Sequence, residues 1–181
     1  TALLITHGVS GSGKTHAGGS LLEAIAAVRL RSDVERKRLF GLGETDSSRS
    51  AVAEGIYTAE AGERTYGRLA ELARGILEAG YPALVDATFL KRAQRQAFEE
   101  LAKELGQPLV ILEMQADAAL LRERIQGRLT AGGDASEADL NVLEHQLKTA
   151  EPLEAEERAA AVTVDSAQPL PLQEIRGRMT D

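Results

Sequence analysis

Residues 8–15 read GVSGSGKT and come directly after a short apolar run, residues 2–6. The segment fits the pattern G-x-x-x-x-G-K-[S/T], whose glycines allow a tight loop with backbone N–H groups pointing at phosphate oxygens. A helical pattern begins at Lys14, so the positive end of a helix would add to the same anion site. Strand, loop and helix in this order indicate a nucleoside-triphosphate site in an α/β protein.

Each polar residue of this loop has an expected role. Lys14 should reach the β and γ phosphates, and the Thr15 hydroxyl should bind a Mg²⁺ ion that bridges them. The residues expected to bind the nucleotide, ATP or GTP, are Gly8, Ser10, Gly11, Ser12, Gly13, Lys14 and Thr15. A plain glycine-rich turn before a helix is the alternative. The dinucleotide spacing G-x-G-x-x-G is absent, which disfavours nicotinamide cofactors.

Five short apolar runs alternate with longer amphipathic stretches along the chain. The expected strands are residues 2–6, 28–32, 83–87, 108–114 and 161–165, and the second departs most from the pattern because Arg29 and Arg31 interrupt it. The expected helices are residues 14–27, 34–40, 58–79, 91–105, 117–129, 137–149 and 170–179. This alternation predicts an α/β fold with a parallel sheet covered on both faces.

Composition narrows the class of protein. The 181 residues, 43% of them hydrophobic, indicate one domain over residues 1–181, and the start at Thr1 without Met suggests that it was excised from a longer chain. The longest apolar run, residues 24–28, is too short to span a membrane. Because there is no cysteine, disulfides and thiolate chemistry are excluded, and we expect a cytoplasmic protein. A net charge of −7 argues against binding along a nucleic-acid duplex.

Two carboxylates are expected beside the loop, because ligands of open parallel sheets bind beyond the carboxyl ends of the strands. Asp33 follows the second expected strand and would serve as general base for an attacking hydroxyl, or as the N-cap of the next helix. Arg36, one helical turn on, would hold the acceptor or the transferring phosphoryl group. Asp86 ends the apolar run before ATF and would lie near Mg²⁺, or cap the following turn.

A further arginine pair lies on the helix expected from residue 117. At 100° per residue, Arg124 and Arg128 fall within the apolar arc of that helix, whereas Arg122 falls on its far side. Two guanidinium groups facing the cleft would clamp phosphates and stabilise the transferring group, or else form partly buried salt bridges.

Residues 117–150 are expected to form a helical lid. Gly132, Gly133 and Asp134 form an expected flexible joint, and Ser136 with Asp139 has the capping-box spacing that starts a helix. Weaker candidates for an acceptor site are Tyr66, Arg68, Lys91 and Arg92. The three histidines show no metal-binding spacing and are not assigned to catalysis.

Together the segments GVSGSGKT, SDVERKRLFGL, LVDATFLKRAQR, LRERIQGR and DASEADLNVLEHQ resemble the P-loop kinase domains that follow aminoglycoside-phosphotransferase-like domains. More distantly, the chain is similar to polynucleotide 5′-kinases and zeta-toxin-type kinases. The resemblance covers essentially the whole chain. It implies a P-loop NTPase fold with sheet order 2-3-1-4-5, a general base at Asp33, an acceptor or phosphate contact at Arg36, and lid arginines at Arg124 and Arg128.

The expected function is ATP- and Mg²⁺-dependent transfer of the γ-phosphoryl group to a hydroxyl of a small molecule. The expected partners are a nucleoside triphosphate, an unidentified hydroxyl acceptor and a fused or separate phosphotransferase-like domain. A polynucleotide 5′-hydroxyl kinase is one alternative, although the sequence lacks an aromatic-rich surface for stacking bases. A regulatory ATPase module of a two-domain protein is the other.

Overall fold

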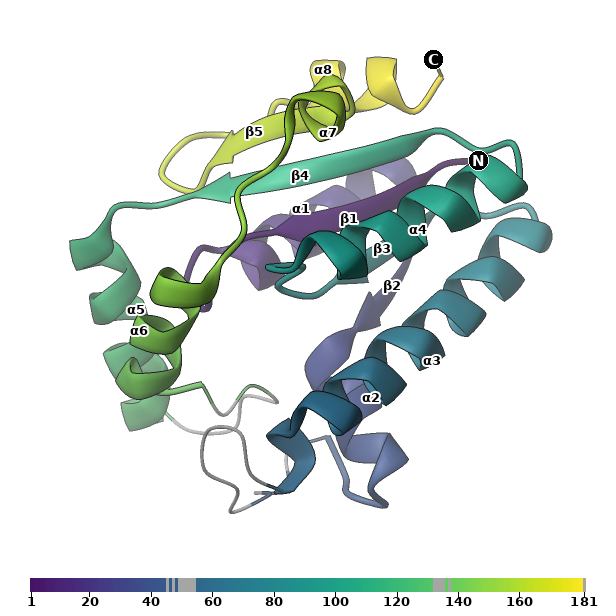
Figure 1. Cartoon of the computed structure of the whole chain (residues 1–181). Helices are drawn as coiled ribbons and strands as arrows, with labels where there is room; N and C mark the ends of the chain where they lie inside the picture. Colours follow the sequence, from purple (N-terminus) through teal and green to yellow (C-terminus); the bar gives the residue numbers. More distant parts are fainter. Residues whose placement is uncertain (45, 47, 49–54, 132–135, 137, 181) are drawn as a thin grey trace.

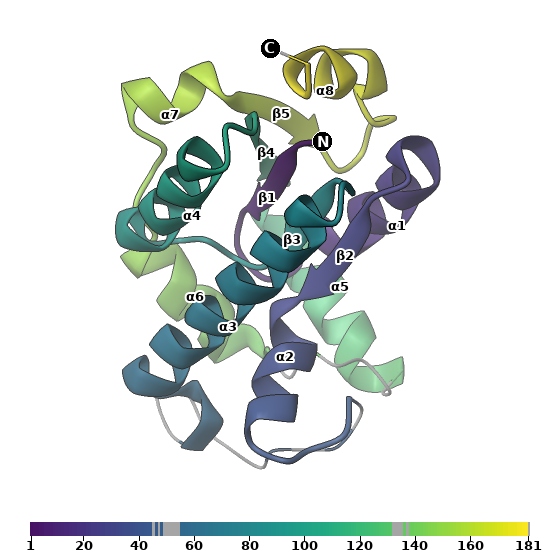
Figure 2. The same ribbon diagram turned by 90° about the vertical axis from the view of Figure 1, so that its right-hand side faces the viewer.

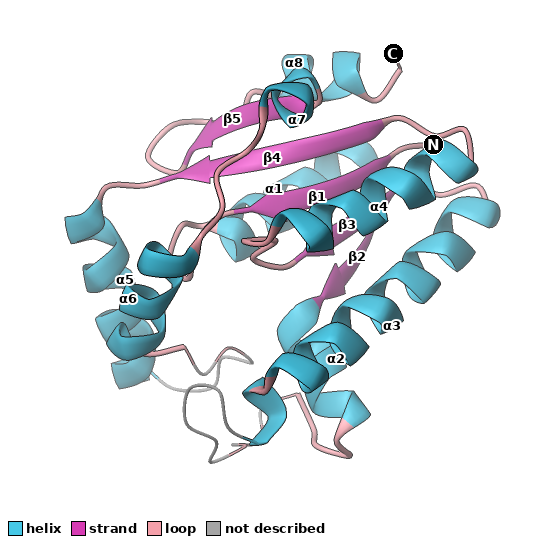
Figure 3. Ribbon diagram, in the orientation of Figure 1, coloured by secondary structure: helices cyan, strands magenta, loops and turns pink. Residues whose placement is uncertain are grey.

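The structure, a computed structural model, describes residues 1–44, 46, 48, 55–131, 136 and 138–180, with the main chain alone at residues 128, 129 and 131. Five parallel strands form one sheet in the order β2-β3-β1-β4-β5, with their carboxyl ends at one edge (Figure 3). The strands are β1 (Leu3–His7), β2 (Val28–Arg31), β3 (Ala83–Asp86), β4 (Leu109–Gln115) and β5 (Ala161–Asp165). The fold class and the strand order expected from the sequence are thus confirmed.

The helices connect the strands and cover both faces of the sheet. They are α1 (Lys14–Ile25), α2 (Ser32–Leu39), α3 (Ala59–Glu78), α4 (Arg92–Glu104), α5 (Ala118–Ala131), α6 (Leu140–Thr149), α7 (Ala155–Ala159) and α8 (Leu172–Arg178), with a 3-10 turn, η1 (Gly55–Tyr57). No helix in the described part of the chain is long and apolar enough to span a membrane.

Alternate side chains of each strand enter two separate cores, as the period of two in a strand requires. In β1, Leu3 and Ile5 pack against α3 and α4, whereas Leu4 packs toward α1 and α8. Figure 2 shows α4 and α7 on one side of β1, β4 and β5, and α1 and α8 on the other. Burial on both faces explains why the inner strands read as continuous apolar runs.

Helices α5 and α6, which we call the lid, lie beyond the carboxyl ends of the strands (Figure 1). Leu121 and Ile125 of α5 and Leu143 of α6 form a third apolar cluster, separate from the two cores of the sheet. The lid is therefore packed mainly within itself and over the end of the sheet.

Several boundaries differ from those expected. Helix α2 begins at Ser32, two residues early, and α6 begins at Leu140 with Asp139 as its N-cap, so Ser136 is not the cap. Asp139 accepts a hydrogen bond of 2.9 Å from the backbone N–H of Val142, which satisfies a free donor of the first turn. The short elements η1 and α7 were not predicted. The joint expected at residues 132–134 lies outside the described residues.

Candidate functional site

The loop between β1 and α1 has the backbone that the phosphate-loop pattern predicts. Gly11 and Gly13 have φ values of +83° and +96°, which favour glycine. A Cβ atom at Gly11 would lie 2.9 Å from the carbonyl oxygen of Leu121, and one at Gly13 would lie 2.9 Å from the Cβ of Ser166. Glycine is therefore required both by the turn and by the close approach of the lid and of the chain after β5.

Lys14 begins α1 and folds back over this loop. Its Nζ donates to the carbonyl oxygens of Gly8 at 3.0 Å and Val9 at 2.7 Å. The ammonium group is thus held at the mouth of the loop, within reach of a bound phosphate chain. A phosphate that binds Lys14 would replace these carbonyl contacts with hydrogen bonds between opposite charges.

Thr15 and Asp86 converge from α1 and the end of β3. The Thr15 hydroxyl lies 3.5 Å from Oδ2 of the buried Asp86 carboxylate. This pair of oxygen donors fits Mg²⁺, which commonly takes one or two protein ligands and completes its shell with phosphates and water. No group of three or more His, Asp and Glu side chains suited to a metal occurs in the described ranges.

Sequence reasoning missed Arg29 of β2, which forms an ion pair with the same Asp86 oxygen. The Nε of Arg29 is buried, and no partner for it exists among the described atoms. Arg29 thus neutralises the carboxylate in this structure. A cation bound between Thr15 and Asp86 would share Asp86 with Arg29 or displace it.

Asp33 lies in the first turn of α2, half-buried at the carboxyl edge of the sheet. It is not the N-cap, because α2 starts one residue earlier and Arg31 occupies the cap position. Burial and the negative charge of Asp86 raise the pKa of the Asp33 carboxyl, and the positive charges of Lys14 and Arg36 oppose that rise. Asp33 thus lines the same cleft as Lys14, Arg36 and Asp86.

Arg36 points to the segment that precedes α3. Its Nη1 donates to the carbonyl oxygen of Ile56 at 2.9 Å, and its guanidinium group lies 5.4 Å from the ring centre of Tyr57. The hydrogen bond and the aromatic contact hold the guanidinium plane on the wall of the cleft beside Asp33.

Arg124 of α5 faces the phosphate loop. It donates to the carbonyl oxygen of Gly11 at 3.2 Å and to the Ser166 hydroxyl at 2.9 Å. Arg122, by contrast, is exposed and donates only to Ala118 of its own helix among the described residues. Arg124 makes no ion pair with a described residue. The side chain of Arg128 lies outside the described residues.

These groups line one cleft of about 1300 Å³ at the carboxyl edge of the sheet. Single-ligand pockets commonly measure about 300–1,000 Å³, so this cleft has room for two substrates. The expected site residues on its wall are Ser10, Gly11, Gly13, Lys14, Thr15, Asp33, Arg36, Asp86 and Arg124. Gln146 of the lid also lines it and was not singled out from the sequence.

The loop after β3 places Thr88 on the wall of the cleft, whereas the next residue, Phe89, is buried. Phe89 has a φ of +47°, unusual for a residue with a Cβ, and its ring packs edge-on between Tyr66 and Phe98. The Tyr66 hydroxyl lies 3.3 Å from the Thr88 hydroxyl and accepts from the Phe89 N–H at 3.1 Å. Tyr66 therefore both shapes this loop and lines the cleft.

The other weak candidates lie elsewhere. Arg68 is exposed and pairs with Glu71. Lys91 and Arg92 bind Glu151, and neither lines the cleft.

Comparison with known proteins agrees with this geometry. Residues 3–153 match the AAA_33 family, described as an AAA domain. The chain belongs to this family. No curated protein matches this AAA-domain chain. The comparisons give no support to an adjoining aminoglycoside-phosphotransferase-like domain.

Solved structures share the fold of this AAA-domain chain. A sugar kinase from Janibacter sp. HTCC2649 has 24% sequence identity, a TM-score of 0.71, and a match over 99% of this chain and 93% of its own. A gluconokinase from Sinorhizobium meliloti 1021 has 24% identity, a TM-score of 0.64, and a match over 99% and 90%. Kti12 from Chaetomium thermophilum, solved with ADP-AlF3, has 14% identity, a TM-score of 0.74, and a match over 98% of both chains. The shared architecture is that of P-loop NTPases.

Proposed function

We propose that this chain is an ATP- and Mg²⁺-dependent phosphotransferase that moves the γ-phosphoryl group to a hydroxyl of a small molecule. The observation that carries the proposal is the position of Asp33. Its carboxyl faces the cleft that Lys14 and Asp86 also line. The pKa of this carboxyl is raised, which brings it closer to neutral pH, and a general base works best when its pKa is near the working pH. Asp33 lines the cleft together with polar groups of α3 and of the segment after β3, which leaves room for an acceptor hydroxyl beside its carboxyl.

The residues then divide the work as follows. Lys14 and the loop N–H groups would hold the β and γ phosphates. Thr15 and Asp86 would hold Mg²⁺, which would neutralise charge on those phosphates. Asp33 accepts the proton of the acceptor hydroxyl as the hydroxyl oxygen bonds to the γ phosphorus. The bond from the γ phosphorus to the β–γ bridging oxygen breaks, and ADP leaves with its electron pair. Arg124 moves from Gly11 and Ser166 to the phosphates, where its charge stabilises the transferring group. Arg128 on the same helix would act with it.

The acceptor is proposed to be a small polyhydroxylated compound. Beside Asp33 the wall of the cleft carries Arg36, Tyr66, Thr88 and Gln94, which offer hydroxyl, amide and guanidinium groups to a polar ligand. Two proteins with the same fold are named as a sugar kinase and a gluconokinase, which supports this class. A polynucleotide acceptor is less favoured because the chain carries a net charge of −7.

The test is ADP release from ATP and Mg²⁺ with a panel of sugars, sugar acids, amino-sugars, nucleosides, aminoglycosides and 5′-hydroxyl oligonucleotides. A phosphotransferase releases ADP faster with its acceptor and forms a phosphorylated product detectable by mass spectrometry. Acceleration by an oligonucleotide alone would favour the polynucleotide kinase. ADP release that no acceptor stimulates would instead favour a regulatory ATPase.

A further inference from the structure

Gln146 of α6 contacts the phosphate loop from a position 136 residues further along the chain. Its Oε1 accepts a hydrogen bond of 2.7 Å from the backbone N–H of Ser10. Backbone N–H groups of this loop are the donors that a phosphate requires, so Gln146 occupies one of the groups that would bind the ligand. The carboxamide thus takes the place of a phosphate oxygen in this structure.

The peptide group between Val9 and Ser10 is held from both sides. Its carbonyl oxygen accepts from Lys14 Nζ at 2.7 Å, and its N–H donates to Gln146. Lys14 is the residue expected to bind the β and γ phosphates, so a bound γ-phosphate would come near this peptide. A triphosphate that draws Lys14 away from Val9 acts on the same peptide that Gln146 holds.

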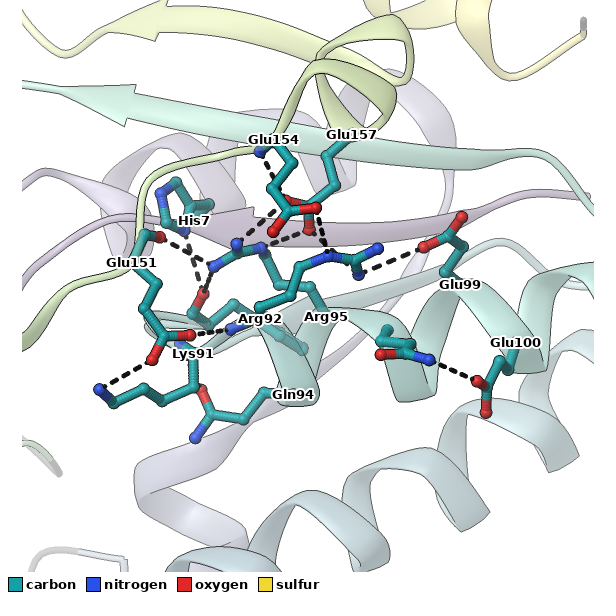
Figure 4. Close-up of polar contacts among 12 residues, drawn as sticks. His7, Lys91, Arg92, Gln94, Arg95, Glu99, Glu100, Glu151, Glu154 and Glu157 are labelled. Carbon is teal, nitrogen blue, oxygen red and sulfur yellow. Dashed lines mark hydrogen bonds and ion pairs between the residues drawn. The ribbon is translucent and has the colours of Figure 1, made fainter.

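Contacts at the carboxyl-terminal end of α6 hold the helix that carries Gln146. Three residues later, the carbonyl oxygen of Thr149 accepts from Lys91 Nζ at 2.8 Å. Glu151 binds both Lys91 Nζ and the backbone N–H of Arg92, as Figure 4 shows. Arg95 donates to the carbonyl oxygen of Glu151 at 3.1 Å. The carboxyl-terminal end of α6 is therefore fastened to the start of α4, and Gln146 approaches the loop from a fixed base.

Glu151, which joins the end of α6 to the start of α4, is negatively charged at neutral pH. Hydrogen bonds from Arg92 N–H and Lys91 lower the pKa of the Glu151 carboxyl, so it is ionised at neutral pH. At the centre of Figure 4, the Arg95 guanidinium forms two hydrogen bonds with Glu157, at 2.6 and 3.0 Å. Side chains on α4, on the segment after α6 and on α7 thus form one connected network.

We propose that Gln146 contacts the γ-phosphate of a bound triphosphate and thereby distinguishes triphosphate from diphosphate. A γ-phosphate oxygen would accept from the Ser10 N–H in place of Gln146 Oε1. The carboxamide would then rotate and donate through Nε2 to the γ-phosphoryl group. A diphosphate does not extend to this peptide, so Gln146 would keep its contact with Ser10. This inference rests on the proposed nucleotide site and deepens it.

The experiment uses a charge series at residue 146. Gln146→Glu places a negative charge, and Gln146→Lys a positive charge, beside the γ-phosphate position. Affinities for ADP and for the non-hydrolysable β,γ-imido analogue of ATP are measured by titration calorimetry with Mg²⁺. The analogue should bind about tenfold or more tightly to Gln146→Lys than to Gln146→Glu, because a full charge a few ångströms from a phosphate is worth more than 1.4 kcal/mol. The ADP affinities of the two variants should differ clearly less than their affinities for the analogue, because the β-phosphate would lie farther from residue 146.

The matched controls are Gln126→Glu and Gln126→Lys. Gln126 is exposed on the other lid helix and does not line the cleft, so these changes alter the charge of the lid without approaching the loop. Equal changes in ADP and analogue affinity at residue 146 would overturn the inference, as would a response no larger than that of the controls. If the unmodified protein binds the analogue and only the selectivity is missing, the inference fails alone. If it binds neither nucleotide, the proposed function fails with it.

Discussion

Replacement of Arg95 by methionine should destabilise the protein strongly, because Arg95 is a buried charge with every donor engaged. Its side chain is 1% exposed and that of Glu157 is 2% exposed. Arg95 donates five hydrogen bonds, two to the Glu157 carboxylate and one each to the carbonyl oxygens of Phe89, Glu151 and Pro152. Arg95→Met leaves the Glu157 carboxylate buried and removes the positive charge and two hydrogen bonds that stabilise its ionised form.

The size of the effect follows from the burial of both partners. Burial alone would raise the pKa of the Glu157 carboxyl, but the hydrogen bonds and charge of Arg95 lower it overall. Removing one partner of such a pair costs about 3–5 kcal/mol. For a chain of this length, about 1 kcal/mol corresponds to 2–4 °C, so the melting temperature should fall by roughly 6–20 °C.

The melting temperature is measured by calorimetry and the free energy of unfolding by urea titration. Two further variants serve as controls. Arg74→Met breaks the exposed ion pair of Arg74 with Glu104, which should change the melting temperature little. The double variant Arg95→Met/Glu157→Met should be more stable than the sum of the single losses predicts, since it leaves no buried unpaired charge. The reasoning is refuted if Arg95→Met melts no lower than Arg74→Met, or if the two buried changes are additive.

The remaining predictions concern the cleft. Lys14→Ala should reduce the rise in melting temperature that ATP and Mg²⁺ produce, and an equal rise in both proteins would contradict the phosphate loop. Asp33→Asn should leave ATP binding nearly intact and lower phosphoryl transfer by about 10²–10⁴, whereas unchanged turnover with a true acceptor would exclude Asp33 as base. Because the pKa of Asp33 is raised in the fold, its ionised form costs stability above that pKa. Asp33→Asn should therefore melt higher at neutral pH, and the gain should shrink as the pH falls through the folded pKa. Arg124→Ala should lower turnover by about a hundredfold with little change in the melting temperature, while Arg122→Ala, its control, should change neither; equal kinetic effects would disprove a role for Arg124.

The architecture could be predicted because it follows from local patterns. Apolar runs alternating with amphipathic stretches place all five strands, and the resemblance supplies their order. Arg29 and Arg31 were the exception to the strand pattern, and their position on the edge strand β2 explains why charged residues are tolerated there. The segment GVSGSGKT predicted a loop whose glycines the structure requires.

The side-chain partners could not be predicted, because they join residues that are distant in the sequence. Gln146 and Ser10 are 136 positions apart, and Arg29 and Asp86 are 57 apart. A lone glutamine on an amphipathic helix carries no signal of its own. The start of α6 was expected too early for another reason: Ser136 with Asp139 fits the capping-box spacing, but Asp139 itself caps the helix by accepting from the Val142 N–H.

The carbonyl oxygen of Phe89 accepts from His7 Nδ1 and from Arg95 Nη1, both at 3.0 Å. A carbonyl cannot donate, so His7 carries its proton on Nδ1, and burial lowers its pKa and keeps the ring neutral. His7 is the last residue before the phosphate loop, and Arg95 holds the chain that leaves the lid. The carbonyl oxygen of Phe89 therefore links the end of β1, which leads into the phosphate loop, to the segment that follows the lid helix α6. Because two hydrogen bonds hold this atom, we expect slow amide exchange at Phe89 and Arg95 both with and without bound nucleotide.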